Sequence, residues 1–190
     1  MTEVPPGVEF HTFTVLGRCA RTGRLGIGTA TRSLAVGARV THARAGLGVV
    51  AIMAIADARL GHMALKLLDL GYKAPSVIEE LVKGDPYAEY RQLGVIDADG
   101  FAAARTGKMN RDWAGHRVGG QHGGQQSAAL LVVDDRRFAY VDLRVDVHPE
   151  PIGELRRVFD AYRPAIPYYN LRQVDARVPP LPDWLSDRGR

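Results

Sequence analysis

The residues of this chain that favour β-strands lie in two groups, separated by a block of amphipathic helix. Residues 10–17 are rich in β-branched and aromatic residues, residues 25–31 alternate with glycine, and the turn-like segment 18–24 between them predicts a hairpin. Residues 45–55 form an apolar run that carries Gly46 and Gly48, as in a buried strand that another backbone approaches closely. A sheet has to bury one of its faces, so these strands require a second packed layer.

The middle of the chain changes to a helical period. In residues 57–70, Leu60, Ala64 and Leu68 fall on one face, and a glycine follows directly as a common helix end. Ser76, with two glutamates behind it, predicts the start of a second helix that continues to residue 83. Further strands are expected at 92–97, 101–106, 127–133 and 138–145, and a last helix at 151–162. This order of elements favours an α+β fold of packed layers over a doubly wound parallel sheet.

The length of 190 residues fits one domain of ordinary size. We expect a flexible tail at 1–10, a folded domain at 11–163 and a proline-rich extended arm without periodicity at 164–190. The arm carries two tyrosines and a tryptophan, and aromatic side chains of this kind predict packing against another surface, such as a second subunit. The sequence therefore predicts a homo-oligomer.

Composition argues against several classes of protein. No apolar run approaches the ~20 residues that cross a bilayer, and the first residues lack the basic and apolar regions of a secretion signal. The single cysteine, Cys19, allows no internal disulfide, which fits the reducing cytoplasm. The formal net charge is +4, but the arginines are interleaved with acids and form no basic stripe, so we expect neither a nucleic-acid nor a membrane partner.

No ligand pattern for a metal or a cofactor stands out in the sequence. His116, His122 and His148 lack the spacing of a compact metal site, so we expect neither metal nor cofactor. The four glycines within residues 119–124 offer backbone N–H groups to an anion. They lack the order of a phosphate-binding loop, however, and a flexible connector is the simpler interpretation.

Nine short segments, in the same order, resemble one known family. They lie at 12–15 (Thr-Phe-Thr-Val), 21–26, 30–37 (Ala-Thr-Arg-Ser-Leu-Ala-Val-Gly), 43–48, 91–97, 106–107, 113–116 (Trp-Ala-Gly-His), 125–133 and 141–149. Together they resemble the domain of unknown function 1028 (DUF1028) family, in a shortened variant, because the family normally has several tens of residues between the segments at 113–116 and 125–133. The resemblance implies the N-terminal-nucleophile (Ntn) hydrolase fold, an αββα sandwich, here with a reduced helical layer. It also implies hydrolysis of an amide-like bond in a small molecule, or a related acyl transfer.

The resemblance gives Thr12 the role of nucleophile. A hydroxyl needs a base, and an N-terminal threonine supplies its own α-amine, whose pKa is near ~8. Arg32 would anchor a substrate carboxylate through its planar fork, with Ser33 and Asp57 as supporting polar groups. An ion pair between Arg32 and Asp57 is the alternative interpretation.

Other residues at family positions are candidates for contact with the substrate. They are Thr31, Gly46, Gly48, Arg105 and His116. Backbone N–H groups near Gly46 and Gly48 would stabilise an oxyanion. His116 alternatively orients the nearby Trp113.

Two features leave other functions open. Thr12 follows eleven residues, and its nitrogen is a non-basic amide while the bond to His11 is intact. Ile52 and Met53 stand where the family tends to have polar residues, and Arg105 stands where it tends to have a histidine. One alternative to a hydrolase is a protein that binds a small ligand, or steers a reactive biosynthetic intermediate, without covalent catalysis. The other is a structural or interaction protein.

Overall fold

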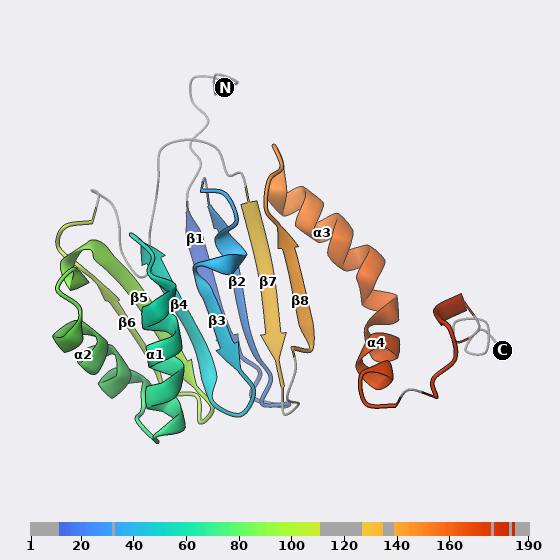
Figure 1. The fold of residues 1–190 in the computed structure, drawn as a ribbon, viewed down its shortest axis with the longest axis horizontal. Coiled ribbons are helices and arrows are strands. Elements are labelled where there is room, and N and C mark those ends of the chain that lie inside the picture. Colours follow the sequence, from blue (N-terminus) through green and yellow to red (C-terminus); the bar gives the residue numbers. More distant parts are fainter. Residues whose placement is uncertain are drawn as a thin grey trace.

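Two four-stranded antiparallel sheets form the centre of the fold (Figure 1). The computed structural model describes residues 12–31, 33–110, 127–134, 139–175, 177–182 and 184. In chain order the elements are β1 (Phe13–Arg18), β2 (Leu25–Thr31), η1 (Val36–Ala38), β3 (Thr41–Arg44), β4 (Gly48–Ala54), α1 (Ala58–Asp69), α2 (Ala74–Gly84), η2 (Ala88–Tyr90), β5 (Arg91–Asp97), β6 (Ala102–Thr106), β7 (Ser127–Val133), β8 (Val141–Val145), α3 (Pro151–Tyr162), η3 (Arg163–Ala165) and α4 (Ile166–Arg172). The predicted α+β class is confirmed.

Sheet A has the strand order β1-β2-β7-β8 and joins distant parts of the sequence. β1 and β2 form the predicted hairpin, in which Phe13 lies opposite Ala30. The turn of this hairpin contains Gly23 with a φ of 69°, a conformation that L side chains rarely adopt. On its other edge, β2 pairs along its full length with β7, where Thr31 lies opposite Ser127. This pairing places a strand from the start of the chain next to one from its last third.

Sheet B has the order β3-β4-β5-β6 and is built from one continuous stretch of the sequence. Its central strand β4 is almost entirely buried, as the apolar run at 45–55 predicted. β3 was not predicted, because its four residues show no clear alternation. A tight turn joins β3 to β4, with Gly46 at a φ of 72°.

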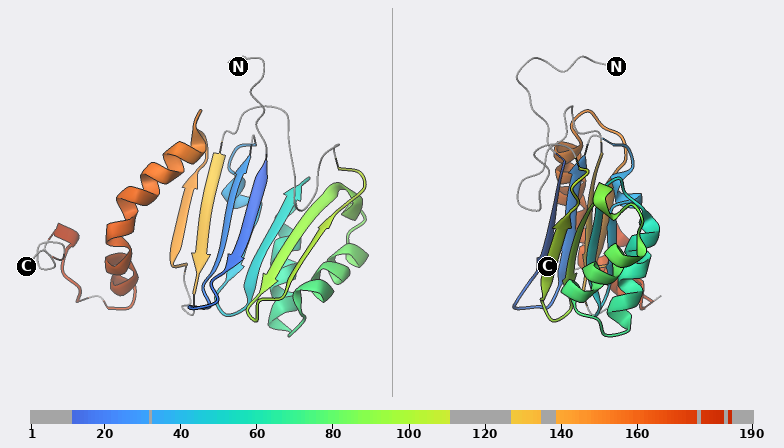
Figure 2. Two further views of the ribbon diagram at one scale, coloured as in Figure 1. Left: turned by 180° about the vertical axis from the view of Figure 1, so that it is seen from behind. Right: turned by 90° about the vertical axis from the view of Figure 1, so that its left-hand side faces the viewer.

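The two sheets pack face to face, and the turned view in Figure 2 shows their strands as adjacent layers. Ile27 and Ala129 of sheet A meet Ala51 of sheet B in one apolar cluster between the sheets. A second cluster joins Leu25 and Val133 of sheet A to Val49 of sheet B. Each of these side chains is buried, and the burial of apolar surface is the main force that holds the layers together.

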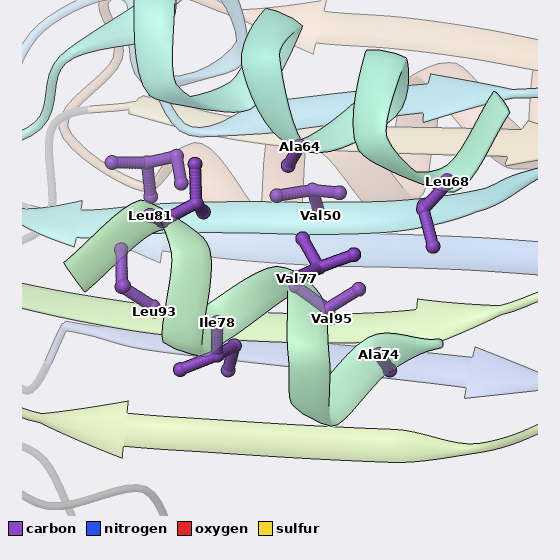
Figure 3. Packing of buried hydrophobic residues seen from close by; sticks show 10 residues of the cluster. Val50, Ala64, Leu68, Ala74, Val77, Ile78, Leu81, Leu93 and Val95 are labelled. Atoms are coloured by element: carbon purple, nitrogen blue, oxygen red, sulfur yellow. The ribbon is translucent and has the colours of Figure 1, made fainter. Parts of the chain in front are cut away.

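Helices α1 and α2 cover the other face of sheet B (Figure 3). The side chains of this cluster come from both helices and from β4 and β5, namely Val50, Ile52, Ala64, Leu68, Ala74, Val77, Ile78, Leu81, Leu93 and Val95. Gly48 lies in close contact with the neighbouring strand β5 and with α1. A Cβ at this position would stand 2.5 Å from the backbone oxygen of Ile96 and 2.8 Å from Cδ1 of Leu68. Packing therefore accounts for this glycine.

Helix α2 begins at Ala74, two residues before the start that Ser76 predicted. The carboxylate of Asp97, at the end of β5, takes the place of a local cap. Its Oδ2 accepts a hydrogen bond from the N–H of Ala74 at 3.1 Å, and its Oδ1 accepts from the N–H groups of Asp99 at 3.1 Å and Phe101 at 2.9 Å. Asp97 is buried, so one side chain fixes both the helix start and the β5–β6 turn.

Helix α3 lies along β7 and β8, and the C-terminal segment continues away from the sheets (Figures 1 and 2). Residues 163–172 are helical, whereas the sequence predicted an extended arm from residue 164. Pro164 and Pro167 occupy first-turn positions, where the missing N–H does not break a helix. Tyr168 is buried, with its ring 5.6 Å from that of Trp184. Within the described residues, no helix is long and apolar enough to cross a membrane.

Candidate functional site

A small pocket opens between the two sheets, at the end where β1 begins and β4 ends. Its described lining residues come from the position before β1, from β2, from the segment that joins β2 to β3, and from the end of β4 and just after it: Thr12, Thr29, Thr31, Ser33, Val36, Arg39, Val40, Met53, Ala54 and Ala56. The pocket has a volume of about 50 Å³, which holds only a few water-sized groups. It therefore suits the end of a small molecule.

Three of the predicted site residues, Thr12, Thr31 and Ser33, meet at this pocket. The hydroxyls of Thr12 and Thr31 are hydrogen bonded at 2.9 Å. One step further along the hairpin, the hydroxyls of Thr14 and Thr29 are 2.7 Å apart. The register places Thr14 directly opposite Thr29, and Thr12, just before β1, lies two residues further along on the same face. The hydroxyl of Thr12 is thus held in place by the strand next to its own.

One wall of the pocket is fastened by Ser127, the first residue of β7. Its hydroxyl donates to the backbone oxygen of Ser33 at 2.6 Å and accepts from the N–H of Val36 at 3.2 Å. Ser127 is fully buried. The next turn is closed by the hydroxyl of Thr41, which donates to the backbone oxygen of Gly37 at 2.9 Å. Side chains of β7 and β3 thus hold the segment between β2 and β3.

Replacing Ser127 with alanine is expected to lower the free energy of unfolding by about 1–3 kcal/mol, because a buried N–H and a carbonyl lose their partner. Chemical denaturation measures this change. Ser33→Ala is the matched control, since Ser127 contacts the backbone oxygen of Ser33 and not its side chain. If both variants lost the same small amount of stability, the bridge would not hold the wall.

Backbone strain is concentrated beside this pocket. Among the described residues, the non-glycine residues with positive φ are Ala35 at 53° and Ala54 at 64°. Ala54 lines the pocket and Ala35 directly precedes the lining residue Val36. An alanine in this left-handed region costs about 1–2 kcal/mol, and such strain tends to occur at functional sites. The position of the strain therefore supports a functional role for the pocket.

Arg39 is the one charged residue among those described in the lining. Its Nη2 donates to the backbone oxygen of Leu34 at 2.7 Å, which ties the guanidinium to the wall. No carboxylate within 4 Å pairs with Arg39 in the part of the chain that the structure describes. The described lining thus offers hydroxyls, apolar groups and one cation, without a carboxylate, imidazole or amine side chain to act as a base.

Asp57 does not line the pocket, although Ala56 before it does. Its carboxylate caps α1, accepting from the N–H of Arg59 at 3.0 Å, and also pairs with the Arg59 guanidinium at 2.7 Å. The buried Arg91 lies 3.9 Å away and binds Asp85 at 3.0 Å. Arg91 also donates to the backbone oxygen of Ile55. This cluster fastens the segment between β4 and α1, next to the pocket.

The hydrogen bonds from Arg59, with the charges of Arg59 and Arg91, lower the pKa of Asp57 from its ordinary value to about 2. A carboxyl with a lowered pKa in the folded state stabilises the protein above its unfolded pKa, which is near ~4, and this stabilisation is lost as the pH falls towards 2. We therefore expect the stability difference between the native chain and Asp57→Asn to be largest above pH ~5 and to shrink in acid. Denaturant unfolding between pH 6 and 2.5 measures it, and a difference independent of pH would contradict this assignment.

The other predicted site residues lie elsewhere. Gly46 and Gly48 are in the turn before β4 and at its start, whereas the pocket is at its end. Arg105 is on β6, where it donates to the backbone oxygen of Ala88 at 2.7 Å and pairs with Glu89. Arg32 and His116 lie outside the described residues. The structure thus brings Thr12, Thr31 and Ser33 together at the pocket. Arg105 and the two glycines do not line it.

Sequence reasoning missed Arg39 and Ser127 as residues of this site, and it noted Met53 only as an apolar residue where the family tends to have a polar one. Arg39 and Met53 meet the threonines only because the two sheets stack, and no local pattern reports that stacking. Ser127 gave one usable signal, since it is a polar residue at the start of an otherwise apolar strand. A buried hydroxyl there has to find hydrogen-bond partners.

Comparisons with known proteins agree with this architecture. The model of a family described as a family of unknown function (DUF1028) matches residues 12–119 and 113–155. The crystal structure of protein SPO2555 from Silicibacter pomeroyi, described with the same family model, is similar with a TM-score of 0.74 and 27% sequence identity, over 80% of this chain and 86% of that one. No curated protein matches the chain. Because the family model covers most of the sequence, the chain belongs to the DUF1028 family.

Proposed function

We propose that the protein hydrolyses an amide-like bond in a small molecule, or transfers its acyl group, with Thr12 as nucleophile and the α-amine of Thr12 as base. The observation that carries this proposal is the hydroxyl of Thr12 in a pocket whose described lining holds no side chain that could accept its proton. A threonine hydroxyl is a weak nucleophile without a base. The α-amine of the same residue, with a pKa near ~8, supplies one once the bond between His11 and Thr12 is cleaved.

In the first step, Oγ1 of Thr12 forms a bond to the carbonyl carbon of the substrate and its proton passes to the α-amine. The resulting ammonium gives that proton to the leaving nitrogen as the C–N bond breaks, which leaves an acyl ester on Thr12. The same α-amine then takes a proton from a water molecule as the water attacks the ester, and the acid is released. In acyl transfer, another nucleophile takes the place of this water. The hydroxyl of Thr31, 2.9 Å from that of Thr12, orients the nucleophile.

The layers of the fold support an Ntn-hydrolase-like architecture as part of this proposal. Two antiparallel sheets are stacked, and α1 and α2 cover sheet B. In the αββα sandwich, helices also cover the second sheet. Here α3 lies along β7 and β8, while Phe13 and Val15 of β1 are 44% and 62% exposed. This exposure fits the reduced helical layer that the resemblance implies.

The test is covalent labelling that depends on cleavage before Thr12. A factor Xa site placed directly before Thr12 lets the folded protein be cut so that the new chain begins at this residue. The probe is N-benzyloxycarbonyl-serine β-lactone, which acylates an activated hydroxyl by ring opening. The experiment uses a Cys19→Ser background, because Cys19 is exposed and the hydrogen bond from the Thr22 side chain helps lower its pKa to about 7, so its thiolate would also react.

Intact mass and peptide mapping should show one added lactone on Thr12 in the cleaved chain. The uncleaved chain and a cleaved Thr12→Val variant should stay unmodified. A cleaved chain that is folded but unlabelled would overturn the assignment of Thr12.

A second candidate function is the binding of a small ligand without catalysis. It is favoured by the uncleaved chain, in which the nitrogen of Thr12 is a non-basic amide. In that state the hydroxyls of Thr12, Thr31 and Ser33 would bind a small ligand without reacting with it. A ligand that raises the midpoint of thermal unfolding equally before and after cleavage, with no turnover in either state, would favour this function over hydrolysis.

A further inference from the structure

We infer that the pocket binds N-acylated α-amino acids and that Arg39 is the residue that holds their carboxylate. This inference rests on the proposed cleavage of an amide-like bond, and it adds the class of substrate to that proposal.

The first argument is the charge of the pocket. Arg39 supplies the one charge among the described lining residues, and that charge is positive. The neighbouring lining groups are threonine and serine hydroxyls, which donate hydrogen bonds to an anion without competing for the guanidinium. An anionic group is therefore the partner that this lining fits best.

The second argument is the way in which Arg39 is held. Its Nη2 binds the backbone oxygen of Leu34 at 2.7 Å, and its backbone N–H donates to the oxygen of Val36 at 3.1 Å. The ring of the buried His42 contacts the backbone oxygen of Arg39 at 3.3 Å. Nη2 has a second N–H, and neither it nor Nε or Nη1 has a protein acceptor among the described residues. The free N–H of Nη2 and the neighbouring nitrogen on its side therefore remain as a parallel pair of donors for a ligand. Two parallel donors match the two oxygens of a carboxylate.

The third argument is size. Arg39 and the hydroxyl of Thr12 line the same pocket of about 50 Å³. A substrate bound by both has its carboxylate and its scissile amide only a few bonds apart. An N-acyl α-amino acid meets this condition, because a single carbon separates its carboxylate from the amide nitrogen. The volume suits this amino-acid end, and on this inference the acyl chain lies outside the pocket.

The test measures binding to the uncleaved full-length protein, where no reaction at Thr12 is needed. N-acetylglycine and N-acetylglycinamide have almost the same shape, and only the first carries a carboxylate. Titrations followed by two-dimensional NMR should give about 10- to 100-fold tighter binding of N-acetylglycine. Arg39→Gln should remove this preference, and Arg39→Lys should keep part of it, because the charge remains and the fork is lost.

Arg21→Gln is the matched control. Arg21 is an exposed arginine in the β1–β2 turn, at the other end of sheet A from the pocket, and the variant should bind like the native chain. Equal affinities of the native protein for the two compounds, no binding of either, or a preference that persists in Arg39→Gln would overturn the inference.

The outcomes separate this inference from the proposed function. A carboxylate preference that depends on Arg39, together with an unlabelled Thr12 in the cleaved chain, would reject the hydrolase and keep Arg39 as a carboxylate-binding residue. A labelled Thr12 without the preference would reject the substrate class alone.

Discussion

Replacing Asp97 with alanine is expected to destabilise the protein by about 3–5 kcal/mol, the largest effect on stability that we predict for a single side chain. The carboxylate accepts three backbone hydrogen bonds, from Ala74, Asp99 and Phe101. Because Asp97 is buried, water cannot easily replace the lost acceptor. Alanine would therefore free the first turn of α2 and the β5–β6 turn at once. Denaturant unfolding at pH 7 measures the loss.

Two variants make the cause clear. Asp97→Asn should lose less stability, since one oxygen remains and can still accept from the turn, whereas its NH₂ group faces a donor. Asp99→Ala is the matched control in the same turn, because the exposed Asp99 side chain forms a surface ion pair with Lys73, and it should change stability by less than about 1 kcal/mol. A loss in Asp99→Ala as large as that in Asp97→Ala would show that the turn, and not the buried acceptor, is responsible.

The largest effect on reactivity is expected at Thr12 in the cleaved chain. Thr12→Val keeps the shape of the side chain and removes the hydroxyl, and it should slow acylation by the β-lactone about 10³-fold or more. Thr12→Ser keeps both the hydroxyl and the α-amine, so it should retain most of the rate. The acylation rate, followed by intact mass, is the measurement.

The same reaction has a pH dependence with a defined sign. The base is the neutral α-amine, so the rate should rise with pH through its pKa near ~8 and level off above it. Acetylating the new N-terminus should abolish acylation while leaving the protein folded. A rate that is independent of pH between 6 and 9, or that survives acetylation, would show that another group is the base.

Much of the fold follows from local sequence patterns. β2, β7 and α3 have the bounds that their composition predicted, because each is a run with one clear period. The start of α2 was placed at Ser76, since a serine followed by glutamates is a common cap. The actual acceptor for its first turn is Asp97, which is far away in the sequence. Local reasoning cannot find a cap that another strand supplies.

The candidate site was predictable only in part. Thr12, Thr31 and Ser33 lie on or directly beside one hairpin, so a correct hairpin register already brings them together. Arg39 contributes through the stacking of the sheets and the bridge from Ser127, both of which depend on long-range packing. The carboxylate-binding role expected at Arg32 stays a prediction, since Arg32 lies outside the described residues, and we infer a similar role for Arg39.

The pairing of β2 with β7 has a consequence for the order in which the protein folds. Sheet B and its helices come from one stretch, residues 41–106, and all the strand pairings of this sheet lie within it. Sheet A needs residues 13–31 and 127–145 together, and closing so long a loop carries an entropic cost. During synthesis the β1–β2 hairpin thus leaves the ribosome early, and β2 lacks its second partner until β7 has been made. We expect the pocket, whose wall depends on Ser127, to form last, so that an unfinished chain exposes no working nucleophile.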